Sequence, residues 1–327
     1  MSGSREVVLL TGVAGFIGSH CAEALLKRGT RVIGVDSFDS FYSAETKRRN
    51  IGEVERSAGA ESGFELVEAD ICDADVMERT MRDRGVTSVL HLAARAGVRP
   101  SIEDPALYAK VNVEGTAVLL EAARKAGSVD RFVMASSSSV YGNNEKVPFS
   151  EEDDVNEPIS PYAATKRACE LIGYTHWKLY GMPVACLRFF TVYGPRQRPD
   201  LAIAKFIRLV ESGEAIPMFG NGDTSRDYTF IDDIVAGVLA SMDRIPEYGY
   251  RIWNLGGSDP VRLDEMIATV GRVVGKPAQL RHETRQMGDV ERTFADLARS
   301  RAELGYSPTT KFEDGVRKQW EWWKRTR

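Results

Sequence analysis

Short runs of Val, Ile and Leu alternate with helical patterns through the first half of the chain, and this alternation constrains the fold more than any other feature. The apolar runs are VVLL, RVIGV, FELV, SVLHL and RFVMA, with amphipathic segments such as IGSHCAEALLKRG and TAVLLEAARKAG between them. Continuous apolar runs separated by helices are typical of parallel strands buried on both faces. The sequence therefore predicts an α/β fold built on a doubly wound parallel sheet.

Three glycines directly follow the first apolar run, in the segment TGVAGFIGSH. Gly12, Gly15 and Gly18 lie between the predicted strand and the predicted helix. Glycine permits a tight turn and a close approach of the backbone to a pyrophosphate, which the positive end of the helix stabilises. The spacing is GxxGxxG, and glycine also serves ordinary strand-to-helix turns. The turn alone is therefore weak evidence for a dinucleotide.

An acidic residue strengthens this interpretation. Asp36 ends the next apolar run, 18 residues beyond Gly18. A carboxylate at about that distance accepts hydrogen bonds from the ribose hydroxyls of the adenosine in Rossmann-type folds. Because the same carboxylate would repel a 2′-phosphate, the sequence favours NAD over NADP.

The pattern changes after residue 190, where segments rich in Pro and Gly, such as YGPRQRP and IPMFGNGDTSRD, interrupt amphipathic helices. Ligands of doubly wound sheets bind beyond the carboxyl ends of the strands, where a second lobe can cover them. We therefore expect a Rossmann-type NAD-binding domain at 1–190, with a return segment near 230–256. A smaller, mixed α/β substrate-binding lobe is expected mainly at 191–327.

The segment SPYAATKRACELIG contains a tyrosine and a lysine four residues apart, Tyr162 and Lys166, which would lie on one face of a helix. Tyrosine, with a pKa near ~10, is a poor base at neutral pH, but a neighbouring ammonium and a nicotinamide cation stabilise its phenolate. Ser137, at the end of the predicted strand RFVMASS, could share a proton with the same substrate oxygen. These residues form a candidate acid/base site.

Composition excludes several classes of function. The chain of 327 residues has 43 Lys plus Arg against 47 Asp plus Glu, so its net charge of -4 gives no reason to expect nucleic acid or an anionic membrane as partner. Cys21, Cys72, Cys169 and Cys186 lack CxxC spacing, which argues against a metal site or a disulfide framework. Without a secretory pattern or an apolar run of about 20 residues, we expect a cytoplasmic protein.

Taken together, the motifs resemble those of the extended short-chain dehydrogenases/reductases, within the nucleotide-sugar epimerases and dehydratases. The resemblance covers nearly the whole chain. It includes the segments TGVAGFIGSH, HLAARAGVRPS, VNVEGT, ASSSSVYG, YAATK, RDYTFIDD and GDVERTFAD.

The resemblance implies three groups of site residues. The catalytic set is Ser137, Tyr162 and Lys166. The NAD contacts, with the glycine turn included, are Gly12, Gly15, Phe16, Ile17, Gly18, Asp36, Ser37, Phe38, Asp39, Ser40, Phe41, Asp70, Ile71, Leu92, Ala93, Ala94, Asn112, Tyr162, Lys166 and Phe190. The contacts to a UDP-sugar are Arg99, Ser137, Ser138, Ser139, Thr191, Arg198, Lys205, Phe206, Pro217, Met218, Phe219, Arg226, Gln286 and Asp289.

Within this group, the reaction depends on the two residues that follow the catalytic hydroxyl. The 4,6-dehydratases have acids there, whereas this chain has Ser138 and Ser139. The related sugar-acid decarboxylases typically have Glu where Ser139 stands. Because serine cannot replace a general acid/base pair, the resemblance favours epimerisation at C4 through a transient 4-keto sugar.

The segment RFFTVYGPRQRPD resembles that of the uronic-acid epimerases. Arg198 would then pair with the C6 carboxylate of the sugar, and Thr191 would donate its hydroxyl. Arg196 is expected to lie in a solvated loop or in a salt bridge. Arg99 could instead approach the carboxylate or the diphosphate, and His91 is expected to be a core residue.

The resulting expectation is an NAD-dependent enzyme that interconverts UDP-glucuronate and UDP-galacturonate. A UDP-glucose/UDP-galactose 4-epimerase, a UDP-glucuronate decarboxylase and a non-catalytic scaffold remain as alternatives. The resemblance also implies a homodimer, formed partly by the predicted helix from Tyr162 to Leu179.

Overall fold

The computed structural model describes residues 6–58, 63–284 and 290–326, and the chain forms two compact units. Unit 1 contains Met1–Gly142, Asp154–Arg188 and Val235–Trp253, and unit 2 contains Asn143–Asp153, Phe189–Ile234 and Asn254–Arg327. The segment Asn143–Asp153 thus groups with unit 2, although it lies within the predicted range 1–190. The binding roles assigned to the two domains remain predictions.

Unit 1 is built on a seven-stranded sheet with the order β10-β6-β5-β4-β1-β2-β3. The pairs β1–β2, β1–β4, β2–β3 and β4–β5 are parallel, with Leu9 opposite Ile33 on one side and Val89 on the other. The strands are β1 (Val7–Thr11), β2 (Arg31–Asp36), β3 (Phe64–Glu68), β4 (Ser88–His91), β5 (Arg131–Ser137), β6 (Val184–Phe189) and β10 (Tyr250–Leu255). The predicted α/β fold with a doubly wound parallel sheet is confirmed.

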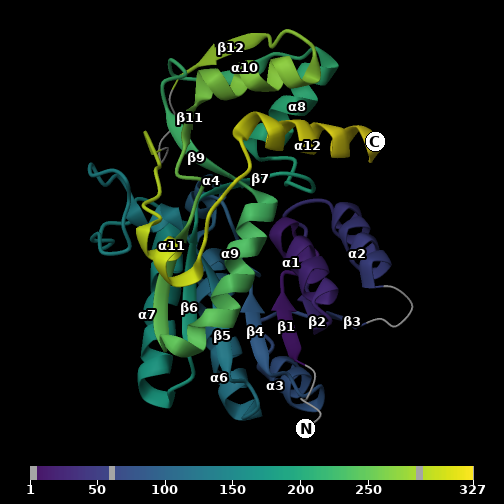
Figure 1. Ribbon diagram of the computed structural model, residues 1–327, viewed down its shortest axis with the longest axis vertical. Coiled ribbons are helices and arrows are strands. Elements are labelled where there is room, and N and C mark those ends of the chain that lie inside the picture. Colours follow the sequence, from purple (N-terminus) through teal and green to yellow (C-terminus); the bar gives the residue numbers. More distant parts are fainter. Residues whose placement is uncertain (1–5, 59–62, 285–289, 327) are drawn as a thin grey trace. The chain divides into compact units, whose positions relative to one another are not determined.

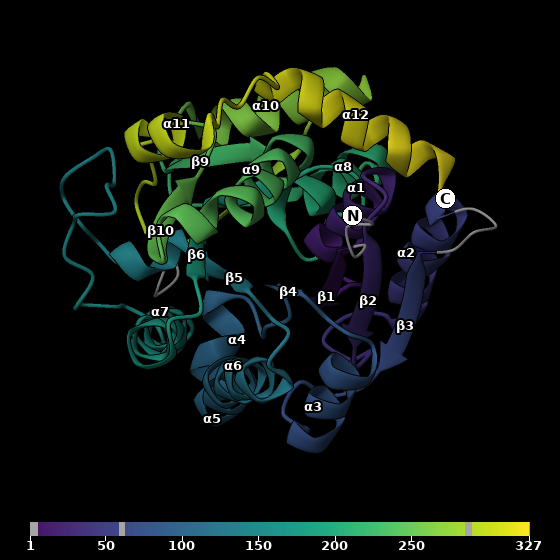
Figure 2. The same ribbon diagram turned by 60° about the horizontal axis from the view of Figure 1, so that its bottom comes forward.

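Helices cover both faces of this sheet: α1 and α2 lie on one face, and α3, α6 and α7 lie on the other (Figures 1 and 2). Their apolar faces pack on strand side chains such as Leu9, Ile33 and Phe132, which are fully buried. The helical segments are α1 (Phe16–Lys27), α2 (Ala44–Ala58), α3 (Ala74–Asp83), α4 (Val98–Glu103), α5 (Pro105–Tyr108), a π-helical turn η1 (Ala109–Glu114), α6 (Gly115–Ala126), a 3-10 turn η2 (Ser138–Tyr141) and α7 (Pro161–Tyr180).

Unit 2 is a mixed α/β arrangement with two small sheets. In the first, β9 pairs in parallel with β7 and antiparallel with β11; in the second, β8 and β12 are parallel. The strands are β7 (Thr191–Tyr193), β8 (Ile216–Phe219), β9 (Ser225–Phe230), β11 (Pro260–Arg262) and β12 (Leu280–Glu283). The helices are α8 (Ala202–Ser212), α10 (Leu263–Val274), α11 (Ala298–Leu304) and α12 (Phe312–Arg325), while α9 (Ile231–Arg244) begins in unit 2, ends in unit 1 and is followed by a 3-10 turn η3 (Ile245–Glu247).

No helix in the described part of the chain combines the length and the apolar character needed to cross a membrane. No group of three or more His, Cys, Asp or Glu side chains in the described ranges is arranged to hold a metal ion.

Candidate functional site

The glycine turn joins β1 to α1 and lies against the loop that follows β4. Gly12 has a φ of 73°, which favours glycine, and a Cβ at this position would lie 2.8 Å from the backbone nitrogen of Ala93. At Gly18 a Cβ would lie only 2.1 Å from the carbonyl oxygen of Gly12. A larger residue at position 12 would therefore push the turn away from the loop after β4, and one at position 18 would push the helix away from the turn.

The amino end of α1 is suited to an anion. The helix begins at Phe16 after Gly15, and neither a side-chain cap nor an acid in the first turn is found there among the described residues. The N–H groups of a first helical turn lack partners within the helix and carry partial positive charge. The turn and the helix end thus fit the diphosphate of a dinucleotide.

Asp36 lies at the end of β2, with its carboxylate directed at the glycine turn. One carboxylate oxygen accepts a hydrogen bond from the backbone of Ala14 at 3.1 Å, and the other accepts from the backbone of Phe38 at 2.8 Å. Lys47 forms an ion pair with the carboxylate at 3.4 Å, and both side chains are buried. A carboxylate has about four lone-pair positions, so Asp36 can still accept from a ribose hydroxyl.

Other predicted NAD contacts have structural partners of their own. Ile71 is buried in the core, where its side chain would meet a Cβ at Gly115. Asn112 accepts a hydrogen bond from the backbone nitrogen of Arg95 at 2.8 Å and donates to the carbonyl oxygen of Arg95 and the hydroxyl of Thr165, each at 3.0 Å. These side chains hold in place the loop after β4 and the segment around Gly115.

A hydrogen bond joins helix α7, which carries Tyr162 and Lys166, to strand β5, which ends at Ser137. Helix α7 begins at Pro161, because Ser160 caps it by accepting a hydrogen bond from the backbone of Ala163. The buried ammonium of Lys166 donates to the carbonyl oxygen of Ala135 at 2.8 Å. Ala135 lies two residues before Ser137, so this bond fixes α7 against the end of β5.

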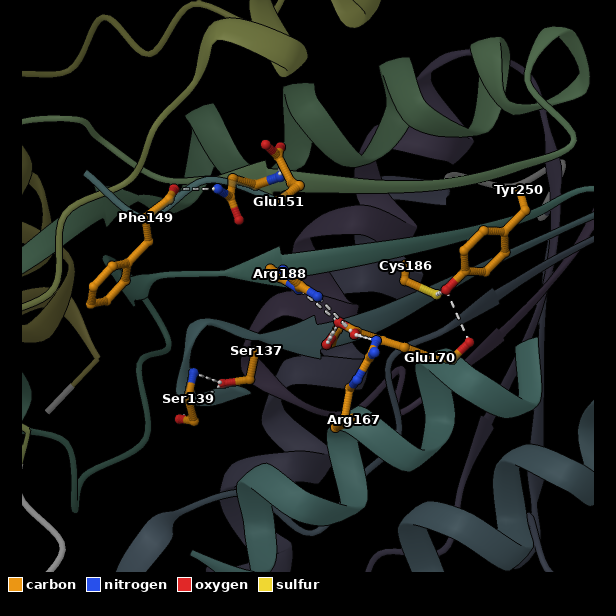
Figure 3. Close-up of polar contacts among 11 residues, drawn as sticks. Ser137, Ser139, Phe149, Glu151, Arg167, Glu170, Cys186, Arg188 and Tyr250 are labelled. Atoms are coloured by element: carbon orange, nitrogen blue, oxygen red, sulfur yellow. Dashed lines mark hydrogen bonds and ion pairs between the residues drawn. The ribbon is translucent and has the colours of Figure 1, made fainter. Parts of the chain in front are cut away.

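Ser137 itself lies at the turn between β5 and η2 (Figure 3). Its hydroxyl oxygen accepts a hydrogen bond from the backbone of Ser139 at 3.1 Å and lies at the same distance from the hydroxyl of Ser139. Ser137 is 8% exposed. The bonds to Ser139 therefore hold the Ser137 hydroxyl in place.

Figure 3 shows a buried ionic cluster on the same helix, one turn beyond Lys166. Glu170 is fully buried and accepts two hydrogen bonds from Arg188, at 2.8 and 2.9 Å. It also accepts hydrogen bonds from Ser136 at 2.7 Å and from Arg167 at 3.0 Å. The cluster links α7 to β5 and β6.

Burial opposes ionisation of Glu170, but the hydrogen bonds and charges of its partners outweigh it. Arg188, Ser136 and Arg167 hold the pKa of the Glu170 carboxyl below its usual range. The carbonyl oxygen of Glu170 accepts a hydrogen bond from the hydroxyl of Tyr250 at 2.9 Å. Glu170 is thus an ionised group that joins α7 to three strands of the sheet.

His91 is a core residue, as expected. Its ring nitrogens lie 2.7 Å from the Thr11 hydroxyl and 3.1 Å from the Thr116 hydroxyl. Burial, assisted by the charge of Lys166, lowers the pKa of His91 to about 3. The ring therefore remains neutral at ordinary pH.

The predicted sugar-nucleotide residues of unit 2 lie on β7, α8, β8 and β9. Phe206 and Met218 are buried, whereas Lys205 and Phe219 are partly exposed. Arg226 donates to the carbonyl oxygens of Ser225, Val290 and Glu291. Of the other predicted residues of this unit, Thr191 and Pro217 lie at or near the starts of β7 and β8, and Arg198 lies in the loop between β7 and α8. Gln286 and Asp289 lie outside the described residues.

A buried acid adjacent to Arg226 holds this part of unit 2 together. The carboxylate of Asp227 accepts hydrogen bonds from the backbones of Gly257, Ser258 and Ala295, at 2.6, 3.0 and 2.9 Å. Burial raises the pKa of Asp227 to about 6, against the opposing effect of these N–H groups. Asp227 therefore fixes the strand from which Arg226 extends.

The arginines of the PRQRPD segment have different environments. Arg198 forms a bidentate ion pair with Asp200, at 2.8 and 3.1 Å. Arg196 is 8% exposed, so the solvated loop is excluded for this residue, and the salt bridge that was the other expectation stays a prediction. Arg99, on α4 of unit 1, is exposed.

Sequence reasoning missed Glu170, Arg188 and Lys47. Glu170 follows Lys166 by four residues and so shares its helical face, which was a usable signal. Arg188 lies within the apolar strand VACLRF, where a charged residue requires a buried partner. Lys47 gave no comparable signal, because it lies in a strongly charged helix.

Comparisons with known proteins agree with this geometry. A family model described as GDP-mannose 4,6 dehydratase matches residues 9–319. A UDP-glucuronate 4-epimerase of Thermodesulfobacterium geofontis is 39% identical over 97% of this chain and 95% of its own length. UDP-glucuronate 4-epimerase 3 of Arabidopsis thaliana is 40% identical over 97% of this chain and 76% of its own length.

Solved structures show the same relationship. The UDP-glucuronic acid 4-epimerase of Bacillus cereus, in complex with UDP-glucuronic acid and NAD, is 34% identical with a TM-score of 0.90, over 98% of this chain and 100% of that one. A UDP-glucose 4-epimerase of Thermotoga maritima, with UDP-glucose, is 32% identical with a TM-score of 0.87, over 98% and 99% of the two chains. This chain therefore belongs to the extended short-chain dehydrogenase/reductase family of nucleotide-sugar-modifying enzymes.

Proposed function

We propose that this protein is an NAD-dependent UDP-glucuronate 4-epimerase. The observation that carries the proposal is the near full-length similarity to UDP-glucuronate 4-epimerases, combined with an intact Ser137, Tyr162 and Lys166 on connected elements. A non-catalytic scaffold would have no physical need for this acid/base set. The positions after Ser137 are serines, so the dehydration named in the family description is disfavoured.

The cofactor is NAD, and the residues around the glycine turn fit it. The uncapped end of α1 suits the diphosphate, and Asp36 suits the adenosine ribose. When bound, NAD accepts the hydride from C4 of the sugar and later returns it. The chain contributes the binding surface, the orientation of the sugar and the transfer of the hydroxyl proton.

In this account Tyr162 is the acid/base that takes the proton of the C4 hydroxyl and gives it back. The ammonium of Lys166, held against β5 by Ala135, favours the phenolate through its positive charge. The Ser137 hydroxyl donates a hydrogen bond to the C4 oxygen and orients it. Epimerisation then requires that the 4-keto sugar rotate and present its opposite face, while the UDP stays bound.

Unit 2 would hold the UDP and the sugar acid. We assign the diphosphate to Arg226 and the C6 carboxylate to Arg198 with Thr191. Because a 4-keto uronate is a β-keto acid, it can lose its carboxylate as CO2. This loss is fastest when the bond to the carboxylate stands perpendicular to the plane of the C4 carbonyl. Arg198 and Thr191 would hold the carboxylate away from that alignment.

A UDP-glucose/UDP-galactose 4-epimerase is the second candidate, and one observation favours it. Asp200 already neutralises Arg198, so this arginine does not need a sugar carboxylate as its counter-ion. The UDP-glucose 4-epimerase of Thermotoga maritima is also similar over nearly the whole chain. UDP-glucuronate remains the preferred candidate substrate, because the relatives with higher identity to this chain are named UDP-glucuronate 4-epimerases.

We propose a homodimer that pairs α7 with its copy, because this helix carries exposed apolar side chains. Leu171, Tyr174, Leu179 and Tyr180 are 52, 45, 66 and 54% exposed, and Ile102 on α4 is 50% exposed. Several large apolar side chains exposed on one helix favour an interface over a surface that faces only solvent. Light scattering of the purified protein should give twice the mass of the chain, and Leu171→Glu should reduce it.

We also propose a cytoplasmic location. All four cysteines are unpaired, and three of them are buried. Free thiols of this kind are typical of a reducing compartment. Fractionation of cells that produce the protein would test the location.

Product analysis tests the proposed function directly. The protein is incubated with NAD and either UDP-glucuronate or UDP-glucose, and the epimers are separated by chromatography. We expect UDP-galacturonate from the first and little UDP-galactose from the second. Equal or faster conversion of UDP-glucose would favour the second candidate, and accumulation of a UDP-pentose would favour a decarboxylase.

A further inference from the structure

An ion pair joins two loops that leave the sheet on opposite sides of β1. The guanidinium of Arg95, in the loop after β4, lies 2.6 Å from the carboxylate of Asp39, in the loop after β2. Since β1 lies between β2 and β4, the pair spans from one side of β1 to the other, at the end where the glycine turn begins.

Other contacts hold in place the two loop segments that carry Asp39 and Arg95. On one side, Asp39 accepts a hydrogen bond from the backbone of Phe41 at 2.8 Å, and the Arg48 guanidinium lies 3.8 Å from the centre of the Phe38 ring. On the other side, Asn112 bonds to both the backbone nitrogen and the carbonyl oxygen of Arg95. This bracing lowers the entropy cost that makes most exposed ion pairs weak.

The same two loops also contact the glycine turn at their bases. The backbone of Ala14 donates to Asp36 at 3.1 Å, and the backbone of Ala93 donates to the hydroxyl of Thr11 at 3.2 Å. The turn, the loop after β2, the ion pair and the loop after β4 therefore form a closed ring of contacts. In folds of this type the diphosphate of the dinucleotide rests against the turn.

We infer that the Arg95–Asp39 ion pair acts as a strap, meaning a contact that retains bound NAD against the glycine turn. The pair must open before NAD leaves. The inference deepens the proposed function, because an epimerase that regenerates its cofactor in every cycle benefits from holding it between cycles. Arg95 is suited to this position, since its planar guanidinium can bond to a carboxylate and a phosphate at once. The Arg95 side chain is 16% exposed and that of Asp39 is 39% exposed, so solvent can reach the pair.

Release of NAD tests the strap without any sugar nucleotide. The protein is loaded with radiolabelled NAD and chased with an excess of unlabelled NAD, and the label bound to the protein is followed over time. Arg95→Gln and Asp39→Asn should each release NAD about two- to fivefold faster than the unmodified protein. High salt should speed release from the unmodified protein and have less effect on either variant.

The matched control is Arg84→Gln, which removes another pair of the same unit with the same 2.6 Å separation, between Arg84 and Glu65. This variant should release NAD at the original rate. The exchanged variant D39R/R95D should recover slow release in part. If Asp39→Asn released NAD at the original rate, Arg95 would act on the cofactor alone and the strap would be refuted. Because no UDP-sugar is present, this result would leave the proposed function untouched.

Discussion

Glu170 and Arg188 form a bidentate ion pair in the interior of unit 1, with nitrogen–oxygen distances of 2.8 and 2.9 Å (Figure 3). Glu170 lies one helical turn beyond Lys166, and another of its partners, Ser136, directly precedes Ser137. The pair therefore braces the two elements that carry the proposed catalytic residues. Neither of its members needs to contact the substrate to affect the geometry of the site.

Removing one member of this pair should be costly. Glu170→Ala leaves the buried charge of Arg188 without its main partner, and we expect the free energy of unfolding to fall by about 3–5 kcal/mol. Replacing both residues by methionine should recover most of this loss. Denaturant unfolding measures both values, and a loss below about 1 kcal/mol in the single variant would contradict the account.

Ser136→Ala provides the matched control, because it removes a hydrogen bond to Glu170 and leaves every charge in place. The expected cost is about 1.5–3 kcal/mol, the usual range for a hydrogen bond to a charged group. If the bond also positions Ser137, kcat should fall while KM changes little.

Acid should destabilise the protein through His91. Its pKa is about 3 in the folded protein and close to 6.5 in the unfolded chain, so the unfolded chain binds the proton more tightly. Stability is therefore fully present above the unfolded pKa and is lost as the pH falls below it. Between pH 6.5 and about pH 4.5, this one residue should account for about 2 kcal/mol.

The comparison with His91→Asn isolates this contribution, since other groups titrate in both proteins. The free energy of unfolding of the variant should depend less steeply on pH over this range, although the variant is less stable at neutral pH. Equal slopes for the two proteins would show that His91 is not held neutral.

The preference for NAD should depend on Asp36. In Asp36→Ala the buried ammonium of Lys47 loses its counter-ion next to the expected position of the ribose 2′-oxygen. A 2′-phosphate would then meet a positive charge in place of a negative one. We expect NAD to bind more weakly and NADP to bind more tightly, by about tenfold each, in equilibrium titrations. An unchanged ratio of the two affinities would mean that Asp36 does not select the cofactor.

The ion pair between Arg198 and Asp200 predicts an unusual gain of affinity. If Arg198 binds the sugar carboxylate, Asp200 competes for the same guanidinium. Asp200→Asn should then lower KM for UDP-glucuronate a few fold, and Arg198→Gln should raise it about tenfold or more. Values for UDP-glucose should change little in either variant. Equal effects on the two sugars would remove Arg198 from the recognition of the acid.

The first half of the fold was predictable because its signals are local. Buried parallel strands read as continuous apolar runs, and the turn from Gly12 to Gly18 follows the first of them. The common helical face of Tyr162 and Lys166 was also predictable, because residues four apart in a helix lie on the same side. These features depend on neighbours in the sequence, which a single chain displays.

Pairings between distant residues could not be predicted in the same way. Asp36 and Lys47, Arg95 and Asp39, and Glu170 and Arg188 each depend on which strands and loops become neighbours. The partner of Arg198 was not predicted either, although it is close in the sequence. The position of Arg198 suggested that it binds an anionic ligand, and in the structure it pairs with Asp200, two residues away. A charged residue indicates that a partner is needed, but only the tertiary structure identifies it.

The central claim is that C4 of the sugar is oxidised and then reduced again, with Tyr162 moving the hydroxyl proton. UDP-glucuronate that carries deuterium at C4 tests it most directly. The UDP-galacturonate formed should retain the deuterium at C4, and Tyr162→Phe should form almost no product while still binding the nucleotide. Loss of the deuterium to water, or turnover by the variant at the original rate, would contradict it.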